Sequence, residues 1–139
     1  MTVPDEIVGR RSFGTAVKIC LRRYAQFEGR APRSEYWWFA LFTVLASIVA
    51  DILDSAFLHG GFGLISDLVW LALLLPSIAV QVRRLHDIDR TGWWWWIVLV
   101  PLLGWILLLV WNCTPGTEGP NRYGDDPLGP GVAPGYVVP

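Results

Sequence analysis

Cysteine and histidine are scarce in this chain, with 2 Cys and 2 His among 139 residues. Cys20 and Cys113 match no zinc, iron–sulfur or CxxC spacing, and a single pair of cysteines makes no disulfide framework. His59 and His86 fall in segments that we predict below to lie on opposite sides of a membrane, so they cannot share an ion. We therefore expect no metal site and no cofactor.

A catalytic constellation is also lacking. No serine or cysteine stands in a recognisable nucleophile setting. His86 beside Asp87 resembles an acid–base pair. However, adjacent residues on a helix point about 100° apart and do not easily bond to each other. We expect no enzymatic activity.

Charge is scarce in three long stretches. Charged residues make up 17% of the chain and hydrophobic residues 53%, against about 25% and roughly 45–50% in soluble domains. The apolar residues gather in blocks at 36–53, 64–82 and 93–111, whose only charges are Asp51 and Asp67, each near a block end. Each block has a length within the roughly 17–25 residues that cross a bilayer. Since no charge lies in the middle of a block, an ion pathway through one subunit is disfavoured. The pattern predicts an all-α membrane protein with three transmembrane helices.

The third block raises an alternative to a straight crossing. The first block opens with the aromatic belt YWW at 36–38, typical of a lipid–water interface. The second contains Pro76, which removes a helix hydrogen bond. The third carries Pro101 and Gly104 at its centre, which could break it into a re-entrant hairpin. Because about nineteen residues span the hydrocarbon once, we predict one straight crossing over 93–111.

The distribution of Lys and Arg predicts an orientation. None lies between the first two blocks, and a single one, Arg122, follows the third. The others precede the first block or join the second to the third, so these two segments are predicted cytoplasmic and the C-terminus periplasmic. On this topology Cys20 and Cys113 face opposite compartments. The basic residues assigned to the cytoplasm are Arg10, Arg11, Lys18, Arg22, Arg23, Arg30, Arg33, Arg83, Arg84 and Arg90.

Segments outside the blocks complete the organisation. Residues 1–35 form a cytoplasmic segment in which 12–27 is an amphipathic cytoplasmic helix preceding the bundle. Its apolar face suits either an anionic leaflet or the protein's own cytoplasmic loop. Residues 36–113 form the bundle, with acidic residues at its outer helix ends interpreted as caps: Asp51, Asp54 and Asp67. Residues 114–139 form a Pro/Gly-rich tail whose far end is predicted disordered.

Three stretches carry a resemblance to a known family. FEGRAPRSEYWWF at 27–39, QVRRLHDIDRTGWW at 81–94 and PGTEGPNRYG at 115–124 resemble, in order and spacing, the signature stretches of the DUF805 family. That resemblance covers 27–124 and implies a small, multi-helix bacterial inner-membrane protein. It supplies no catalytic residue, substrate or cofactor.

Charged residues flank the blocks and form the candidate site. If the helices pack as a bundle, the segment before the first block and the one between the second and third meet at one face. Arginine forks bind phosphate or carboxylate, so such a cluster suits a lipid headgroup or an acidic partner. The alternative is a topology signal with internal salt bridges, for example Arg83 with Asp87. The candidate residues are Arg30, Arg33, Glu35, Arg83, Arg84, His86, Asp87 and Arg90, with a candidate polar turn at Asn121, Arg122 and Tyr123.

These features lead to a functional hypothesis. We expect a non-enzymatic, multi-pass inner-membrane protein that serves as an interaction or accessory subunit of a larger membrane complex. The alternative is a protein that binds or transports anionic lipid headgroups with the cytoplasmic arginines. The expected partners are membrane lipids, including anionic phospholipid, and a membrane protein or a second copy of the chain, with no nucleic acid.

Overall fold

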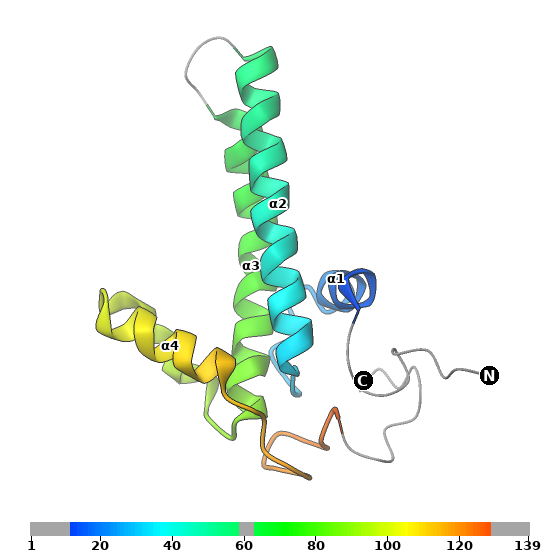
Figure 1. Cartoon of the computed structure of the whole chain (residues 1–139), viewed down its shortest axis with the longest axis vertical. Coiled ribbons are helices and arrows are strands. Elements are labelled where there is room, and N and C mark those ends of the chain that lie inside the picture. The colour runs from blue at the N-terminus through cyan, green and yellow to red at the C-terminus, as the bar shows by residue number, and fades with distance from the viewer. Residues whose placement is uncertain (1–11, 59–62, 129–139) are drawn as a thin grey trace, which may run out of the picture.

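The computed structural model describes residues 12–58 and 63–128, and Figure 1 shows how its helices are arranged. Two long helices stand side by side as the α2–α3 hairpin, and the other elements gather around its lower part (Figure 1). Within the described residues the chain has no named strand, so the all-α prediction is confirmed there. The elements in order are α1 (Phe13–Arg22), α2 (Arg33–Phe57), α3 (Leu64–Asp87), the 3₁₀ helix η2 (Gly92–Leu99) and α4 (Leu103–Cys113).

The first two apolar blocks form helices that are long enough to span a membrane. α2 has 25 residues and α3 has 24, which gives each a length of about 36–38 Å at 1.5 Å per residue. Both are apolar enough to cross by composition and length, since a hydrocarbon core is about 30 Å thick. Each helix extends beyond its predicted block, to Arg33 in α2 and to Asp87 in α3. The added turns are the polar ones, whose charged side chains have partners described below.

The third block does not form one straight helix, so the predicted single crossing over 93–111 is wrong. η2 ends at Leu99, the chain reverses, and α4 begins at Leu103. The turn places Leu102 at a positive φ of 65°, and a Cβ on Gly104 would lie 1.8 Å from the Ile97 carbonyl oxygen. Pro101 cannot donate a backbone hydrogen bond to continue the helix. The η2–α4 hairpin therefore depends on a glycine where two backbones touch.

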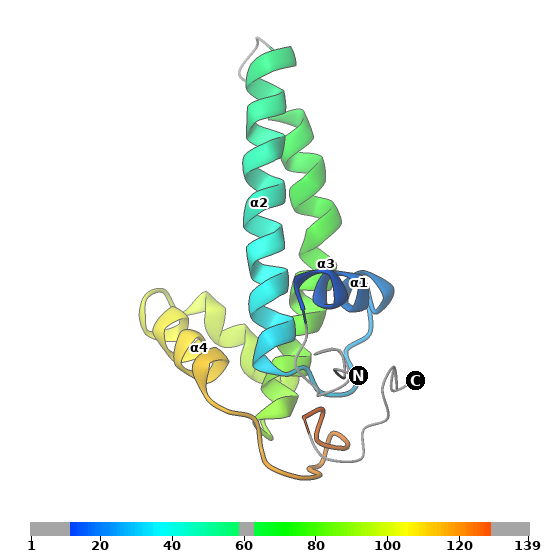
Figure 2. The same ribbon diagram turned by 45° about the vertical axis from the view of Figure 1, so that its right-hand side comes forward.

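α1 confirms the predicted amphipathic helix, although it ends at Arg22 rather than at Phe27. Ser12 caps it, since its Oγ accepts a hydrogen bond from the Thr15 amide at 3.4 Å. The helix lies across the lower part of α2 and α3 (Figure 2), with Ala16 and Cys20 buried. Packing on the protein itself is therefore the arrangement found, while contact of its exposed apolar side chains with a lipid leaflet stays a prediction.

The loop after α1 is anchored at the proline of α3. Pro76 has no N–H, so it cannot bond to the carbonyl of Ala72, four residues earlier. The Tyr24 hydroxyl donates to that Ala72 carbonyl oxygen instead. α3 thus continues through Pro76 with the vacated acceptor bonded to a side chain, as membrane helices require.

Acidic side chains close the far end of the α2–α3 hairpin. Asp54 accepts hydrogen bonds from the amides of Ile65 at 2.9 Å and Ser66 at 2.8 Å. Ser66 Oγ also donates to Asp51 at 2.5 Å. The first amides of a helix lack intrahelical partners and favour an anion. Capping is therefore confirmed for Asp54, which belongs to α2 but caps α3.

Candidate functional site

The candidate residues meet at the lower end of the α2–α3 hairpin. Arg30 comes from the loop before α2, Glu35 from the first turn of α2, and Arg83, Arg84 and Asp87 from the end of α3. All five are buried, and we call them the buried cluster. The structure thus brings together the two segments that the sequence predicted would meet.

Arg83 and Glu35 form one half of the buried cluster. Arg83 Nη1 lies 2.5 Å from Glu35 Oε1, with 0% and 1% of the two side chains exposed. The Cys20 thiol donates to the same oxygen at 3.8 Å. Burial, together with the negative charge of Glu35, raises the pKa of the Cys20 thiol to about 12. This pair therefore fastens α1, α2 and α3 to one another and keeps Cys20 protonated.

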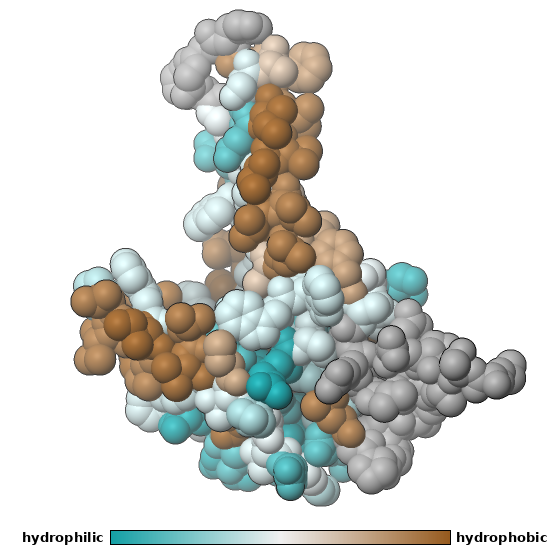
Figure 3. Space-filling model, in the orientation of Figure 1, coloured by the Kyte–Doolittle hydropathy of each residue, from teal (hydrophilic) through white to brown (hydrophobic). Residues whose placement is uncertain are grey.

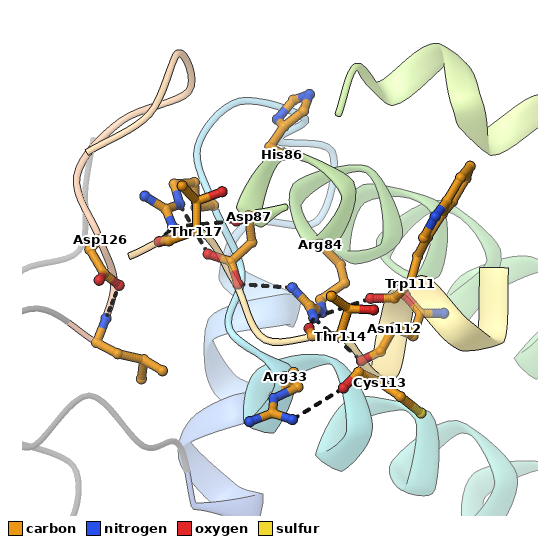
Figure 4. A network of polar contacts seen from close by, with 12 residues as sticks. Arg33, Arg84, His86, Asp87, Trp111, Asn112, Cys113, Thr114, Thr117 and Asp126 are labelled. Atoms are coloured by element: carbon orange, nitrogen blue, oxygen red, sulfur yellow. Dashed lines mark hydrogen bonds and ion pairs between the residues drawn. The ribbon is translucent and has the colours of Figure 1, made fainter. Parts of the chain in front are cut away.

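Asp87 is the centre of the other half. Its Oδ1 lies 3.0 Å from Arg30 Nε, and its Oδ2 lies 2.9 Å from Arg84 Nη1. Figure 4 shows the bond from Arg84 and the carbonyls beyond it. The expected pairing of Arg83 with Asp87 is wrong: the partner of Asp87 along α3 is Arg84, three residues earlier. One carboxylate thus neutralises two buried guanidinium groups.

The arginines also explain why the third block turns back. Arg84 Nη2 donates to the carbonyls of Trp111 at 3.3 Å and Asn112 at 3.4 Å, and also to Thr114. Arg33 Nη1 donates to the Cys113 carbonyl at 3.1 Å. The last carbonyls of a helix have no intrahelical partners and attract cations. Two guanidinium groups thus hold the C-terminal end of α4 beside the buried cluster.

The segment after α4, residues 114–124, is wrapped around Arg30, and we call it the tail turn. Arg30 donates to the carbonyls of Thr117 at 2.6 Å and Gly119 at 2.8 Å. A Cβ on Gly116 would lie 2.3 Å from Asp87 Oδ2, so only glycine allows this approach. The sequence signal was the glycine spacing of PGTEGPNRYG, although it did not identify Arg30 as the residue bound.

The predicted polar turn contacts His86. Asn121 Nδ2 donates to the His86 carbonyl at 2.9 Å, and the Tyr123 ring stacks on the imidazole at 3.9 Å with an interplanar angle of 1°. His86 Nδ1 lies 3.0 Å from the Gly29 carbonyl oxygen. Arg122 is exposed and pairs with Asp89 at 3.1 Å. The stacking and hydrogen bonds fix His86 in place, while the Asp87 carboxylate pairs with Arg30 and Arg84 instead.

Two polar contacts were missed by the sequence reasoning. Gln81 and Asn112 exchange hydrogen bonds through their amide groups at 2.8 and 3.1 Å, joining α3 to α4. Trp37 Nε1 donates to the Asn112 carbonyl at 3.2 Å. Arg90, the remaining candidate, lies over the Trp111 ring at 4.4 Å, a cation–π contact. The sequence holds a signal for the contact between Gln81 and Asn112, because Gln81 lies near the end of the second apolar block and Asn112 directly follows the third.

The tail turn lies at the same end of the α2–α3 hairpin as the buried cluster, so the expected separation of the two by the membrane is wrong for residues 114–128. Cys20 and Cys113 are likewise at one end; both are free thiols, the first buried and the second exposed. Which end faces the cytoplasm stays a prediction. The expected disorder of the far tail concerns residues 129–139, and these residues, like His59, lie outside the described residues.

Comparison with known proteins places the chain in a family. Residues 24–125 match the family described as "Protein of unknown function (DUF805)". The chain is 43% identical over 110 residues to "Inner membrane protein YhaH" of Escherichia coli strain K12, covering 77% of this chain and 91% of that protein. It is 48% identical over 109 residues to "Inner membrane protein YhaI" of the same strain, covering 77% and 90%.

A more distant relative, the E. coli "Uncharacterized protein YiiR", is 31% identical over 134 residues, covering 72% of this chain and 84% of that protein. No solved structure matches. The names of the two nearer relatives agree with the two apolar helices α2 and α3, which supports a membrane protein. From the match over residues 24–125, this chain belongs to the DUF805 family.

Proposed function

We propose that this protein is a non-enzymatic interaction or accessory subunit of a larger complex in the inner membrane. The observation that carries the proposal is an exposed carboxylate, Asp51, on an otherwise apolar stretch of α2. Ile48 and Ile52 beside it are 50% and 61% exposed, and Phe57, beyond it toward the helix end, is 73% exposed. Apolar surface thus continues on both sides of Asp51.

This stretch belongs to the part of the hairpin that stands alone. Figures 1 and 3 show the upper half of the α2–α3 hairpin as a narrow, mostly hydrophobic stalk with no other labelled element beside it. Charged side chains within membrane helices are rare and normally face protein or water. Asp51 lies six residues before the end of α2, and within the chain it accepts a hydrogen bond from Ser66 Oγ at 2.5 Å. A partner helix that covers Asp51 would remove it from lipid, and polar contacts of this kind hold membrane helices together.

The alternative, headgroup binding by the cytoplasmic arginines, has less support. Arg30, Arg83 and Arg84 are at most 6% exposed and are bonded to Glu35, Asp87 and tail carbonyls. A phosphate would have to displace these internal partners, and breaking a buried pair is costly. We therefore assign the buried cluster a structural role.

We also propose that the end carrying the buried cluster faces the cytoplasm. Of the eleven Lys and Arg residues, Arg10 and Arg11 lie outside the described residues. The other nine lie on α1, in the loop between α1 and α2, on the lower turns of α2 and α3, in the loop between α3 and η2, or in the tail turn. The η2–α4 hairpin returns Arg122 to this end too. A third crossing would have placed Arg122 on the opposite side of the membrane from the other basic residues. With the hairpin, the basic residues of the described chain lie at one end, which is a stronger positive-inside signal.

The test is purification from the native membrane in a mild detergent, followed by native mass spectrometry. We expect discrete heavier species that contain other subunits or a second copy. Ser55→Trp, one turn from Asp51, should dissociate them. Val49→Trp should not, because Val49 is also exposed but lies about 160° around the helix from Asp51. A wild-type protein that stays monomeric, or equal effects of both substitutions, would contradict the proposal.

A further inference from the structure

A groove lies between the α2–α3 hairpin and the η2–α4 hairpin. Its volume is about 470 Å³, and side chains of both hairpins line it. Most of the lining residues are aliphatic or aromatic. The lining includes Ala40 and Thr43 of α2, Leu74 and Ser77 of α3, Trp95 of η2 and Trp105 of α4. Apolar side chains cover much of the stalk and of the η2–α4 hairpin on the face shown in Figure 3, so the groove lies between two surfaces that suit lipid chains.

Several of the polar groups that border the groove already bond to other groups of the protein. Gln81 and Asn112 bond to each other at 2.8 and 3.1 Å. Trp37 Nε1 donates to the Asn112 carbonyl at 3.2 Å, and Thr43 Oγ1 donates to the Ala40 carbonyl at 2.7 Å. A polar ligand would gain few hydrogen bonds here. An apolar chain therefore suits the groove better than a polar molecule.

One cation stands at the lower end of the groove. Arg33, Trp37 and Ala40 are spaced i, i+4 and i+7 and share a face of α2, and Trp37 and Ala40 line the groove. Arg33 is exposed, and one of its nitrogens donates to the Cys113 carbonyl at 3.1 Å (Figure 4). Within the described residues no carboxylate pairs with it. The positive charge of Arg33 is therefore exposed and has no carboxylate paired with it in the described part of the chain, whereas the arginines of the buried cluster are buried and paired.

The distance from this cation to the far end of the groove fits a lipid. Arg33 and Thr43 are ten residues apart on α2, which is about 15 Å along the helix. One leaflet of a hydrocarbon core of about 30 Å has the same thickness. A lipid whose phosphate sits on Arg33 therefore has its acyl chain alongside the groove.

We infer that the groove and Arg33 form a binding site for one anionic glycerophospholipid. An acyl chain lies between the two hairpins, and the guanidinium of Arg33 binds the phosphate. The uncompensated positive charge favours a lipid with net negative charge over a zwitterionic one. This site uses none of the buried arginines and lies apart from Asp51, so it is independent of the proposed subunit interface.

The test measures the lipid retained by the full chain after exchange into detergent with equal amounts of phosphatidylglycerol and phosphatidylethanolamine of matched chains. Native mass spectrometry should show one retained phosphatidylglycerol, favoured about tenfold. Arg33→Gln should abolish the preference, while its amide N–H can still bond to the Cys113 carbonyl. Arg22→Gln, which removes another exposed arginine, should leave the preference unchanged.

A second pair of variants tests the groove itself. Ala40→Phe fills it and should lower retention of both lipids, whereas Val49→Phe places the same aromatic side chain at an exposed position elsewhere on α2 and should not. The inference is overturned if Arg33→Gln retains as much phosphatidylglycerol as the wild type, if both lipids are retained equally, or if Ala40→Phe has no effect. Any of these results leaves the comparison of Ser55→Trp with Val49→Trp unaffected.

Discussion

Replacing Asp87 by Asn should release the tail turn and the end of α4 without unfolding the α2–α3 hairpin. The substitution keeps the side-chain shape but removes the negative charge that Arg30 and Arg84 share, and the side chains of these three residues are at most 3% exposed. Breaking a buried ion pair by removing one partner costs about 3–5 kcal/mol. Arg84 keeps its bonds to the α4 carbonyls, so we expect the low end, about 3 kcal/mol.

The position of the bonds shows where this loss should appear. The Thr117 amide donates to the Asp87 carbonyl at 2.8 Å, inside the region that loosens. A change of about 3 kcal/mol raises the equilibrium for opening by roughly a hundredfold. Hydrogen exchange of the Thr117 amide should therefore accelerate by about two orders of magnitude. Amides in the middle of α2 should change little, because the Arg83–Glu35 pair remains intact.

Asp89→Asn is the matched control. It removes a carboxylate two residues away whose pair with Arg122 is exposed, with 64% of the Arg122 side chain and 42% of the Asp89 side chain accessible. Exposed pairs contribute about 0–1 kcal/mol, so exchange at Thr117 should change less than about fivefold. Equal effects of Asp87→Asn and Asp89→Asn, or uniform loss of protection across α2, would refute the structural role of the buried cluster.

Three further predictions concern other contacts. Gly116→Ala places a methyl group 2.3 Å from a carboxylate oxygen of the cluster and should displace the tail turn, seen as faster amide exchange there; an unchanged exchange rate would argue against this close approach. At pH 8 a maleimide should modify exposed Cys113 and not Cys20, and raising the pH to 10 should convert only about 1% of Cys20 to thiolate because burial raises its pKa to about 12. Peptide mass spectrometry reports both thiols, and rapid modification of Cys20 would contradict its burial. Tyr24→Phe should cost about 1 kcal/mol in a detergent unfolding titration and nearly nothing in a Pro76→Ala background, where the restored amide bonds the same carbonyl; equal costs in both backgrounds would show that the hydroxyl does not serve that acceptor.

The two long helices were predictable because the information lies in local composition. Apolar runs of sufficient length become helices in a membrane, since every backbone group must be bonded within the segment. The amphipathic helix before them and the capping role of Asp54 were predictable for the same reason, from periodicity and from an acidic residue near a helix end. The aromatic residues at 36–38 also begin the apolar part of α2, as expected of an interface.

The η2–α4 hairpin was not predictable from the length of its block. Nineteen uncharged residues satisfy a criterion of length whether they cross once or turn back at their centre. The choice depends on a contact between Gly104 and the Ile97 carbonyl and on guanidinium groups that bind the last carbonyls of α4 from 27 to 80 residues away in the sequence. Such partners exist only once the helices have packed.

The amino-acid sequence by itself determined that the protein has apolar helices for a membrane, that its basic residues gather at one end, and that arginine and carboxylate groups would meet there. The tertiary structure alone decided which groups pair. Arg83 and Arg84 are adjacent and chemically identical, but their side chains point about 100° apart on α3, so one reaches Glu35 on α2 and the other reaches Asp87 and the end of α4. The two carboxylates of the buried cluster are thereby bonded to Arg30, Arg83 and Arg84, and Arg33 is exposed without a carboxylate partner among the described residues.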